Sequence, residues 1–410
     1  MTSTLQPETT SNDRRANLSI LALTAFLRGA HTSVYNVIWQ PFVLSLGASM
    51  PAVGLLNSVG GNAGLIPTLV QPLGGWLADR LGRKPFIILA SIAFIACYAL
   101  FWLSGALNIW VLLLLGVVAL GVTALALPAR NSMTAESVRE RHGSAFSAIM
   151  VATMLPGILV PPFAGVLADR LGYISVFPLA AALEALALFL VWRYMRETRL
   201  SDGGGIRWRD TSRVMLRSIV PPPGLGGFFS AVAADSFFWS VGWGLLYGMI
   251  SDTYHFSAEQ LGIMSGVMSL AWAIVQMPIG RYIDRHDIKL LMIFSEGVGI
   301  PLMMIWITQT RFEIFAASHI LMALTAATWV PTVSTYLTRK VGPAERAEAF
   351  GRLYLFRGVV AFPSSTIGGL LYAWGGLRVP LVVNLLGILV IMAILALFVH
   401  EPERNQEVVL

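Results

Sequence analysis

The amino-acid sequence predicts an all-α integral membrane protein with twelve transmembrane helices, arranged as two pseudo-symmetric bundles of six. Three features lead to this prediction: the composition, two long uncharged runs and an internal repeat. Of the 410 residues, 56% are hydrophobic and only 12% are charged, and the mean hydropathy is +0.71. A soluble domain typically carries about 25% charged residues. The chain is therefore expected to fold in a lipid bilayer.

The uncharged runs define the spans. Residues 29–78 and 86–129 contain no Asp, Glu, Lys or Arg. A bilayer core needs roughly 20 helical residues, so each run must hold two spans, with turns at 47–51 and 104–108. The same reasoning along the chain predicts spans at 17–45, 50–77, 86–104, 108–135, 143–167, 174–194, 225–250, 258–280, 288–308, 312–337, 347–371 and 379–399.

The long polar stretch in the middle of the chain is expected to be a linker. It runs from 193 to 217, is basic and glycine-bearing, and is followed by three prolines at 221–223. We therefore divide the chain into a first bundle, 1–195, a cytoplasmic linker, 196–223, and a second bundle, 224–410. The N-terminus lacks the features of a cleaved signal peptide, and the single cysteine, Cys97, lies within a span.

The basic residues predict the orientation in the membrane. Of the 28 Lys and Arg residues, six lie within predicted spans or in loops on the opposite side, which leaves 22 on the side of both termini. Because positive residues accumulate in cytoplasmic loops, both termini are expected to be cytoplasmic, in a multi-pass protein of the plasma (inner) membrane. The net charge of +6 reflects this bias and does not indicate nucleic acid as a partner.

The two predicted bundles are related by an internal repeat. GGWLADR at 74–80 matches IGRYIDR at 279–285, RHGSAF at 141–146 matches ERAEAF at 345–350, and AGVLADRLG at 164–172 matches GGLLYAWGG at 368–376, with offsets of 204 or 205. Parallel six-span repeats joined by a linker build one architecture of secondary transporter, in which the solute site lies between the halves near the membrane midplane. Duplication without transport is the alternative.

The loop after the second span carries a specific signature. The segment GWLADRLGRK at 75–84 resembles the signature G-x-L-A-D-R-x-G-R-K of the major facilitator superfamily at every specified position, and the resemblance extends over essentially the whole chain. It implies that Asp79 contacts the start of span eleven, near Ala347, and closes the cytoplasmic side. The residues of this expected latch are Gly75, Asp79, Arg80, Gly82, Arg83 and Lys84, and in a degenerate second copy Gly280, Asp284 and Arg285.

Physical chemistry gives these residues compatible roles. Gly74 and Gly75 allow close helix packing, and the carboxylate of Asp79 suits a helix N-terminus. Arg80, Arg83 and Lys84 are expected to face the anionic cytoplasmic leaflet. In the second copy Asp287 stands where the signature has glycine. The alternative is that both loops serve only to orient the protein.

Span five resembles the antiporter signature of the same family in part. Gly157, Pro161, Pro162 and Gly165 follow its spacing, with proline and valine replacing two glycines. These residues are expected to bend and thin the helix, although Pro and Gly are also ordinary in membrane helices. The arginine that drug antiporters carry in span four is missing, because residues 115–119 are apolar.

Ionisable residues deep in the membrane are the candidate site, since a charge in hydrocarbon requires a partner or a function. Arg28 in span one and Asp235 in span seven lie near the midplane and are repeat mates at an offset of 207. We expect them to pair across the solute cavity, or to form a static ion pair. The remaining candidates for substrate contact are His31 and Tyr35 on the face of Arg28, Trp239 one turn after Asp235, and Arg357 in span eleven.

Other buried charges are expected to be structural. Glu184 and Glu296 are assigned to hydrogen bonds between packed helices, His319 to a satisfied core position, and Arg130 to the cytoplasmic mouth. Asp235 is the expected carrier of a coupling proton, with His31 as its helper.

The sequence favours a secondary active transporter over an enzyme. It has no nucleotide-binding glycine loop, no cluster of metal ligands and no paired nucleophile and base, so neither a cofactor nor ATP is expected, and a proton gradient is the expected energy source. We predict a monomeric exporter that exchanges a small organic solute for protons. The alternatives are an organic-anion symporter or uniporter, in which Arg28 and Arg357 hold a carboxylate, and a non-transporting receptor on the same fold.

Overall fold

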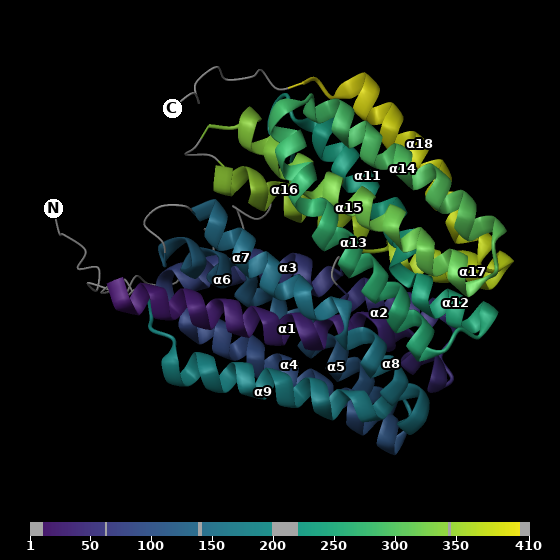
Figure 1. Cartoon of the computed structure of the whole chain (residues 1–410), viewed down its shortest axis with the longest axis horizontal. Coiled ribbons are helices and arrows are strands. Elements are labelled where there is room, and N and C mark those ends of the chain that lie inside the picture. Colours follow the sequence, from purple (N-terminus) through teal and green to yellow (C-terminus); the bar gives the residue numbers. More distant parts are fainter. Residues whose placement is uncertain (1–10, 62–63, 138–141, 199–219, 343–345, 402–410) are drawn as a thin grey trace. The chain divides into compact units, whose positions relative to one another are not determined.

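The computed structural model describes residues 11–61, 64–137, 142–198, 220–342 and 346–401 (Figure 1). Every regular element in these ranges is a helix, which confirms the predicted all-α class. Most of the predicted linker, 196–223, lies outside the described residues.

The helices form two compact units. Unit 1 comprises residues 1–46, 59–209 and 257–262, and unit 2 comprises residues 47–58, 210–256 and 263–410. Relative to the predicted bundles, two short segments, 47–58 and 257–262, belong to the opposite unit. Each of them packs its backbone against that unit: an added Cβ at Gly54 would lie 2.3 Å from the carbonyl oxygen of Ser365, and one at Gly262 would lie 2.4 Å from that of Pro161.

The helices of the first half of the chain cover the first six predicted spans. They are α1 (Ser11–Ser45), α2 (Met50–Gly60), α3 (Leu65–Leu81), α4 (Lys84–Leu107), α5 (Trp110–Val122), α6 (Ala126–Glu136), α7 (His142–Met154), α8 (Val160–Leu171) and α9 (Val176–Tyr194). Short 3-10 turns, η1 (Thr123–Leu125) and η2 (Leu155–Ile158), interrupt spans four and five, and η3 (Tyr173–Ser175) precedes α9.

The helices of the second half cover the last six predicted spans. They are α11 (Gly226–Gly242), α12 (Leu246–Tyr254), α13 (Ala258–Arg285), α14 (Ile288–Thr308), α15 (Phe312–Lys340), α16 (Arg346–Ala361), α17 (Ser364–Gly375) and α18 (Arg378–Phe398), with the turn η4 (Trp243–Leu245) between α11 and α12.

The two units use the same packing plan. In unit 1, α4 packs against α5 and α9, and α1 packs against α7 and α9. In unit 2, α14 packs against α15 and α18, and α11 packs against α16 and α18. Each of these helices in unit 2 is the repeat mate of its counterpart in unit 1, so the sequence repeat corresponds to a repeat in packing.

Nine helical stretches within the described residues are long and apolar enough to cross a bilayer. The other three predicted spans are also helical, over Ser11–Ser45, 226–254 and 346–375. They carry Arg28, Asp235 and Arg357, the deeply placed charges of the sequence. Polar residues lower the mean hydropathy of a span, so the least apolar spans are those that bear the candidate site.

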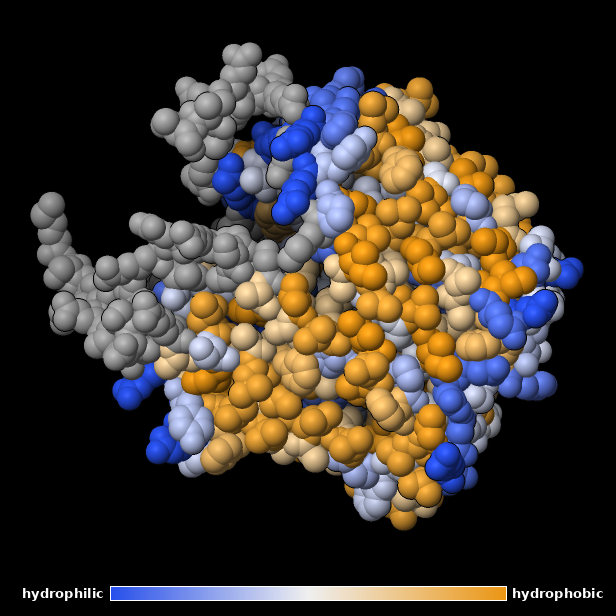
Figure 2. Space-filling view, in the orientation of Figure 1, coloured by the Kyte–Doolittle hydropathy of each residue, from blue (hydrophilic) through white to orange (hydrophobic). Residues whose placement is uncertain are grey.

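Apolar side chains also cover much of the surface seen in Figure 2. Phe163, Leu171, Trp374 and Leu397 are each more than 65% exposed. A soluble protein rarely exposes so many large apolar residues in contiguous patches. This surface is suited to contact with lipid.

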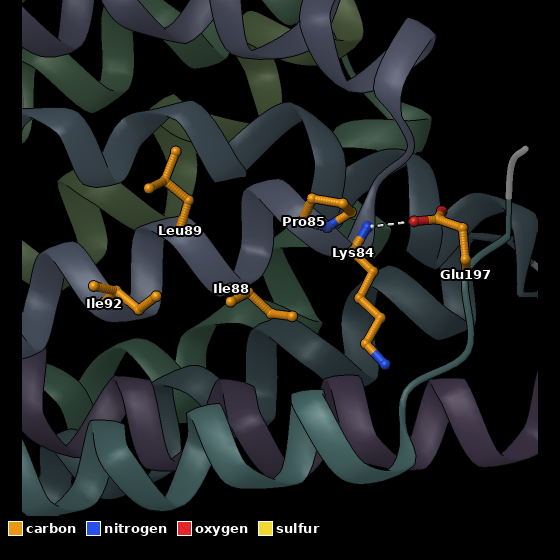
Figure 3. A pocket seen from close by; sticks show the side chains of 6 residues that line it. All are labelled: Lys84, Pro85, Ile88, Leu89, Ile92 and Glu197. Atoms are coloured by element: carbon orange, nitrogen blue, oxygen red, sulfur yellow. Dashed lines mark hydrogen bonds between the residues drawn. The ribbon is translucent and has the colours of Figure 1, made fainter. Parts of the chain in front are cut away.

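The third span of each half, α4 in the first and α14 in the second, begins with the same kind of N-terminal cap. The carboxylate of Glu197 accepts from the backbone N–H groups of Arg83 and Lys84 (both 2.9 Å) at the start of α4, as Figure 3 shows for Lys84. The carboxylate of Glu401 accepts from Ile288 and Lys289 (2.9 and 2.8 Å) at the start of α14. Acceptors at a helix N-terminus satisfy N–H groups that have no partner within the helix.

Two of the three basic residues expected to face the lipid headgroups, Arg83 and Lys84, also bond to neighbouring helices through their side chains. Arg83 is only 4% exposed, and its Nη2 pairs with Glu136 Oε1 at 2.8 Å. Lys84 Nζ donates to the carbonyl oxygens of Trp192 and Met195 at the end of α9 (3.0 and 2.7 Å). Both cations therefore tie α4 to its neighbours.

Candidate functional site

Within the described residues, each unit has a cluster of ionisable side chains that are buried or partly buried. In unit 1 the cluster consists of Arg28, His31, Arg130 and Glu184, which we call the arginine cluster. In unit 2 it consists of Asp235, Trp239, Glu296 and Arg357, which we call the carboxyl cluster. The two clusters are described separately.

Helix α1 presents Arg28 and His31 on one face, because residues three apart lie one turn apart. Both side chains bind the same acid, Glu184 of α9. Arg28 Nη2 donates to Glu184 Oε1 at 3.0 Å, and His31 Nε2 lies 2.6 Å from Glu184 Oε2. Glu184 and His31 are completely buried, and Arg28 is 8% exposed. A buried carboxylate is thus compensated by two partners from one helix.

Helix α4 completes the partners of α1. Ser91 Oγ accepts from Arg28 Nη2 at 3.3 Å, and Tyr98 Oη lies 2.7 Å from His31 Nδ1. A neutral histidine that donates from Nε2 to Glu184 can accept from the Tyr98 hydroxyl at Nδ1. Both ring nitrogens are therefore hydrogen-bonded, and the imidazole orientation is fixed.

Arg130 of α6 is the second cation of the arginine cluster. It interacts electrostatically with Arg28 and Glu184, so it belongs to the cluster, whereas the sequence placed it at the cytoplasmic mouth. Within the described part of the chain, Nε and Nη2 of Arg130 and Nε of Arg28 are buried without a hydrogen-bond partner. Glu184 thus pairs directly with Arg28 but not with Arg130 among the contacts described, and the cluster retains unused N–H donors.

Tyr35 lies one turn further along α1, in an aromatic group. Its ring stacks on Trp39 and Phe101, with centroids 5.4 and 6.2 Å away. The structure therefore places this predicted substrate contact beside the arginine cluster, with a packing role among aromatic side chains.

In the carboxyl cluster two acids lie side by side. Asp235 of α11 is hydrogen-bonded to Glu296 of α14, and Glu296 is completely buried. Trp239 Nε1 donates to Glu296 Oε2 at 3.3 Å. Glu296 Oε1 has no N–H or hydroxyl donor within the described residues. A proton shared with Asp235 would supply the missing donor.

Three further groups act on Asp235. Trp329 of α15 and the adjacent Ser236 donate hydrogen bonds to its carboxylate, and Arg357 of α16 attracts it electrostatically. The guanidinium of Arg357 also lies 5.1 Å from the ring centre of Tyr354. Because two adjacent carboxylates repel each other and Glu296 is completely buried, this arrangement favours one proton on the pair.

The partners of the predicted residues were only partly anticipated. Arg28 is paired with Glu184, and the expected pair with Asp235 would join the two units and stays a prediction. Glu184 and Glu296, which the sequence assigned to helix packing, are the acids at the centres of the clusters. The signal was present, since each is a single acid within a long apolar span.

The signature loop is partly described. An added Cβ at Gly74 would lie 2.2 Å from the carbonyl oxygen of Leu125, which confirms the expected close packing. Gly82 has a φ of 98°, and Arg80 lies 4.1 Å from the ring centre of Trp76. Gly75 packs on Pro128.

The acidic residues of the expected latch cannot be placed. The side chains of Asp79, Asp284 and Ala347 lie outside the described residues, so the proposed contact stays a prediction. In the second copy, an added Cβ at Gly280 would meet nothing within 4 Å, and Arg285 is the last residue of α13.

Span five is interrupted where the antiporter-like residues lie. Helix α7 ends at Met154, the turn η2 contains Gly157, and α8 begins just before Pro161 and Pro162. An added Cβ at Gly165 would lie 2.3 Å from the carbonyl oxygen of Ala258 in α13. The close approach expected at Gly165 is observed, the regular α-helix is interrupted at the expected place, and the bend itself stays a prediction.

Comparisons with known proteins agree with this architecture. Residues 21–247 and 225–409 match the family model described as "Major Facilitator Superfamily". Among solved structures, a bacterial homolog of the human lysosomal transporter Spinster, in an inward-facing and unoccupied conformation, superposes with a TM-score of 0.72 at 16% identity and covers 95% of this chain and 98% of its own. At this identity the likeness concerns the fold.

The curated relatives include the multidrug resistance protein MdtG from two bacteria. The protein of Enterobacter lignolyticus (strain SCF1) is 30% identical over 189 residues, which cover 45% of this chain and only 44% of that relative. The protein of Proteus mirabilis (strain HI4320) is 24% identical over 404 residues and covers 90% of this chain and 98% of the relative.

Proposed function

The chain belongs to the major facilitator superfamily, and from this premise we propose that it is a proton-coupled exporter of a small organic solute. The family makes it a multi-pass membrane transporter of small molecules rather than an enzyme. The proton coupling, the direction of transport and the orientation with both termini in the cytoplasm of the inner membrane are our proposals.

The observation that carries proton coupling is the contact between Asp235 and Glu296. Two neighbouring buried carboxyl groups hold one proton more readily than none, because the doubly ionised pair is repulsive and poorly solvated. Arg357 opposes this effect, since a nearby cation favours the ionised form of Asp235. A movement of the Arg357 guanidinium away from Asp235 would therefore favour binding of the proton, and its return would favour release.

His31 is the second proposed proton carrier. Its imidazole bridges Tyr98 and the carboxylate of Glu184, and imidazole is the side chain that titrates nearest to working pH. Protonation of His31 would leave Glu184 with two cationic partners. The protonated imidazole would then compensate the charge of the Glu184 carboxylate. The guanidinium of Arg28 would become partly available to bind a solute.

Export is supported by two observations. The MdtG relatives are named as multidrug resistance proteins, and span five carries the partial antiporter signature at Gly157 and Pro161. Its break at Leu155–Ile158 gives the span a flexible point at which the two helical segments can change angle.

The first experiment identifies a usable probe. Purified protein is heated in the presence of ethidium, carboxyfluorescein or an uncharged aryl glycoside, which represent organic cations, anions and neutral amphiphiles. The compound that raises the Tm most is then loaded into proteoliposomes, because a ligand that binds the native state stabilises it.

The decisive test compares two kinds of transport in these vesicles. We expect Asp235→Asn and Glu296→Gln to retain exchange of the probe between equal pools but to lose concentrative transport driven by a pH gradient. His31→Gln should lower the driven rate less. The matched control is Glu313→Gln, an acid whose side chain is 68% exposed. Concentrative transport by Asp235→Asn would exclude this residue as the coupling site, and no pH-driven transport by the wild type would refute proton coupling.

An organic-anion symporter or uniporter is the second candidate, favoured by the unused N–H donors of Arg28 and Arg130. In that case Arg28→Ala and Arg357→Ala should each weaken the binding of carboxyfluorescein, while ethidium should bind no worse once a repelling charge is removed. Equal losses for both probes would point to a structural role of these arginines.

A further inference from the structure

The hexapeptide LADRLG occurs twice in the chain, at 77–82 within the signature loop and at 167–172 after span five. The two copies have the same local structure. Helix α3 ends at Leu81 and α8 ends at Leu171, and the following glycines, Gly82 and Gly172, have φ values of 98° and 84°. Glycine adopts such positive φ values readily because it has no Cβ. Asp79 and Asp169 therefore occupy the same position relative to their helix ends.

The two copies lie on opposite faces of the membrane. Span two ends at the first copy, and the next three candidate spans are Lys84–Leu107, Trp110–Glu136 and Ala148–Leu171. The chain crosses the bilayer three times between the copies. Because this number is odd, the two copies lie on opposite faces of the membrane. This assignment requires no assumption about which face is cytoplasmic.

The hexapeptide at 167–172 makes the kind of contact that the family resemblance led us to expect of the hexapeptide at 77–82. Asp169 Oδ1 accepts from the backbone N–H of Ala258 at 2.9 Å, and Oδ2 accepts from that of Glu259 at 2.8 Å. These are the first two residues of α13. A carboxylate at this position both satisfies the free N–H groups and faces the positive end of the helix dipole.

The remaining donors of the first turn are satisfied locally. Ser257 Oγ accepts from the N–H of Gln260 at 3.2 Å, and Gln260 Oε1 accepts from the N–H of Ser257 at 2.9 Å. The N–H of Leu261 donates to the carbonyl oxygen of Ser257. This reciprocal capping box leaves two N–H groups to a residue from another helix, and Asp169 supplies both acceptors.

Backbone packing holds α8 against α13 beside this carboxylate. An added Cβ at Gly165 would lie 2.3 Å from the carbonyl oxygen of Ala258, and an added Cβ at Gly262 would lie 2.4 Å from that of Pro161. The helices touch at these glycines. The first turn of α13, through Gly262, belongs to unit 1, and from Ile263 onward the helix belongs to unit 2.

We propose that Asp169, Gly165 and Gly262 form a second latch, on the face opposite the signature loop, which holds the start of α13 on α8 and releases it when the solute site opens to that face. The proposal rests on transport by alternating access, but not on proton coupling or on the direction of transport. The same hexapeptide would then restrain opposite faces in alternate states, with Asp79 in one and Asp169 in the other.

Spin-label distances test this latch without a solute. Cysteines at the exposed positions Ala106 and Thr310 mark the loops after spans three and nine, on the face of Asp169, and native Cys97 is completely buried. We expect Asp169→Asn to shift the Ala106–Thr310 distance distribution toward longer distances, with a two- to thirtyfold change in the ratio of closed to open molecules, on the order of the effect of removing a helix cap.

Two further variants make the result specific. Asp252→Asn, which neutralises an exposed acid on the same face that contacts Tyr372, should leave the distribution unchanged. Gly262→Ala should lengthen the distances as Asp169→Asn does, since its methyl group collides with Pro161, and it tests the latch if the aspartate variant folds poorly.

The distance measurement also separates this proposal from the proposed function. Unchanged distances in both Asp169→Asn and Gly262→Ala, or an equal shift in Asp252→Asn, would overturn the latch even if pH-driven transport is intact. A shift in Asp169→Asn and Gly262→Ala alone would support it even if the protein proves to be a uniporter.

Discussion

The arginine cluster of unit 1 and the carboxyl cluster of unit 2 are built on equivalent positions of the internal repeat, but the first has more basic than acidic side chains and the second more acidic than basic ones. Arg28 and Asp235 are repeat mates at an offset of 207, and Ser91 and Glu296 at an offset of 205. The hydrogen bond between α1 and α4 in unit 1, which joins Arg28 and Ser91, thus corresponds to the bond between α11 and α14 in unit 2, which joins Asp235 and Glu296.

The compensating charges come from different helices in the two units. Glu184 of α9 compensates Arg28, whereas its repeat mate in α18 is the apolar Ile388. Arg357 of α16 compensates Asp235, whereas its repeat mate in α7 is Thr153. The same helix arrangement therefore tolerates a basic residue in one unit and an acidic residue at the equivalent position of the other, provided that each buried charge keeps a partner. The arrangement itself, including the caps by Glu197 and Glu401, is common to both units.

The largest expected effect comes from breaking the arginine cluster. Glu184→Gln removes the acid that Arg28 and His31 share, and it leaves a buried guanidinium without its counter-charge. Loss of one partner of a buried pair typically costs about 3 to 5 kcal/mol. We expect a marked fall in the Tm of the purified protein, followed by tryptophan fluorescence, while the exposed variant Glu313→Gln stays near the wild type. Equal Tm values for the two variants would show that Arg28 finds another partner.

A glycine of α1 sets the spacing of the arginine cluster. An added Cβ at Gly29 would lie 2.0 Å from the carbonyl oxygen of Thr153 in α7, whereas one at Gly297 in α14 would meet nothing within 4 Å. We therefore expect Gly29→Ala to cost about 1 to 3 kcal/mol by forcing two backbones apart. Gly297→Ala should be neutral or slightly stabilising. Thermal unfolding of both variants checks this, and a harmless Gly29→Ala would contradict the close approach of α1 to α7.

Replacing an acid of unit 2 by its repeat mate should be milder. Glu296→Ser gives the carboxyl cluster the residue that unit 1 has at Ser91, and it leaves Asp235 with Arg357 as a counter-charge. No charge loses its partner, but Trp239 Nε1 loses its acceptor, so we expect a stability loss of about 1 to 3 kcal/mol, together with loss of pH-driven transport. A destabilisation as large as that of Glu184→Gln would show that the two clusters are not equivalent in this respect.

The smallest expected effect concerns the Glu401 carboxylate, which caps the N-terminus of α14 in unit 2. Burial and the neighbouring Asp287 carboxyl raise the pKa of Glu401, and the hydrogen bond to Glu401 lowers the pKa of Asp287. A raised pKa means that Glu401 binds its proton more tightly in the folded state. This contribution to stability is complete below the ordinary glutamate pKa of about 4.3 and is lost as the pH rises through the raised value.

Glu401→Gln removes this dependence. The Tm of the wild type relative to this variant should therefore decline as the pH rises above about 4.3, by less than the equivalent of about 1 kcal/mol for a partly exposed group. Asp287 acts in the opposite sense and at lower pH, because its stabilising effect is lost only as the pH falls below the ordinary aspartate pKa of about 3.9. A constant difference in Tm across this range would contradict a coupled pair.

The fold could be predicted from the sequence because a bilayer imposes strong local rules. Uncharged runs of 50 and 44 residues leave little choice but hairpins of membrane helices. The offset of 204 to 207 residues also placed Arg28 and Asp235 in equivalent positions. The breaks within spans could be anticipated only in part: Pro161 and Pro162 marked the one in span five, while η4 follows no proline.

The sequence by itself thus determined the helices, the repeat and the list of buried charges, since each depends on composition along the chain. The tertiary structure alone decided the partners: Glu184 for Arg28 and His31, Glu296 for Asp235, and α13 for Asp169. These pairs lie 61 to 156 residues apart, and a side chain of the same type can face lipid, a neighbouring helix or another charge. Which of these it meets depends on how the helices are rotated and packed, and no local pattern in the sequence encodes that rotation.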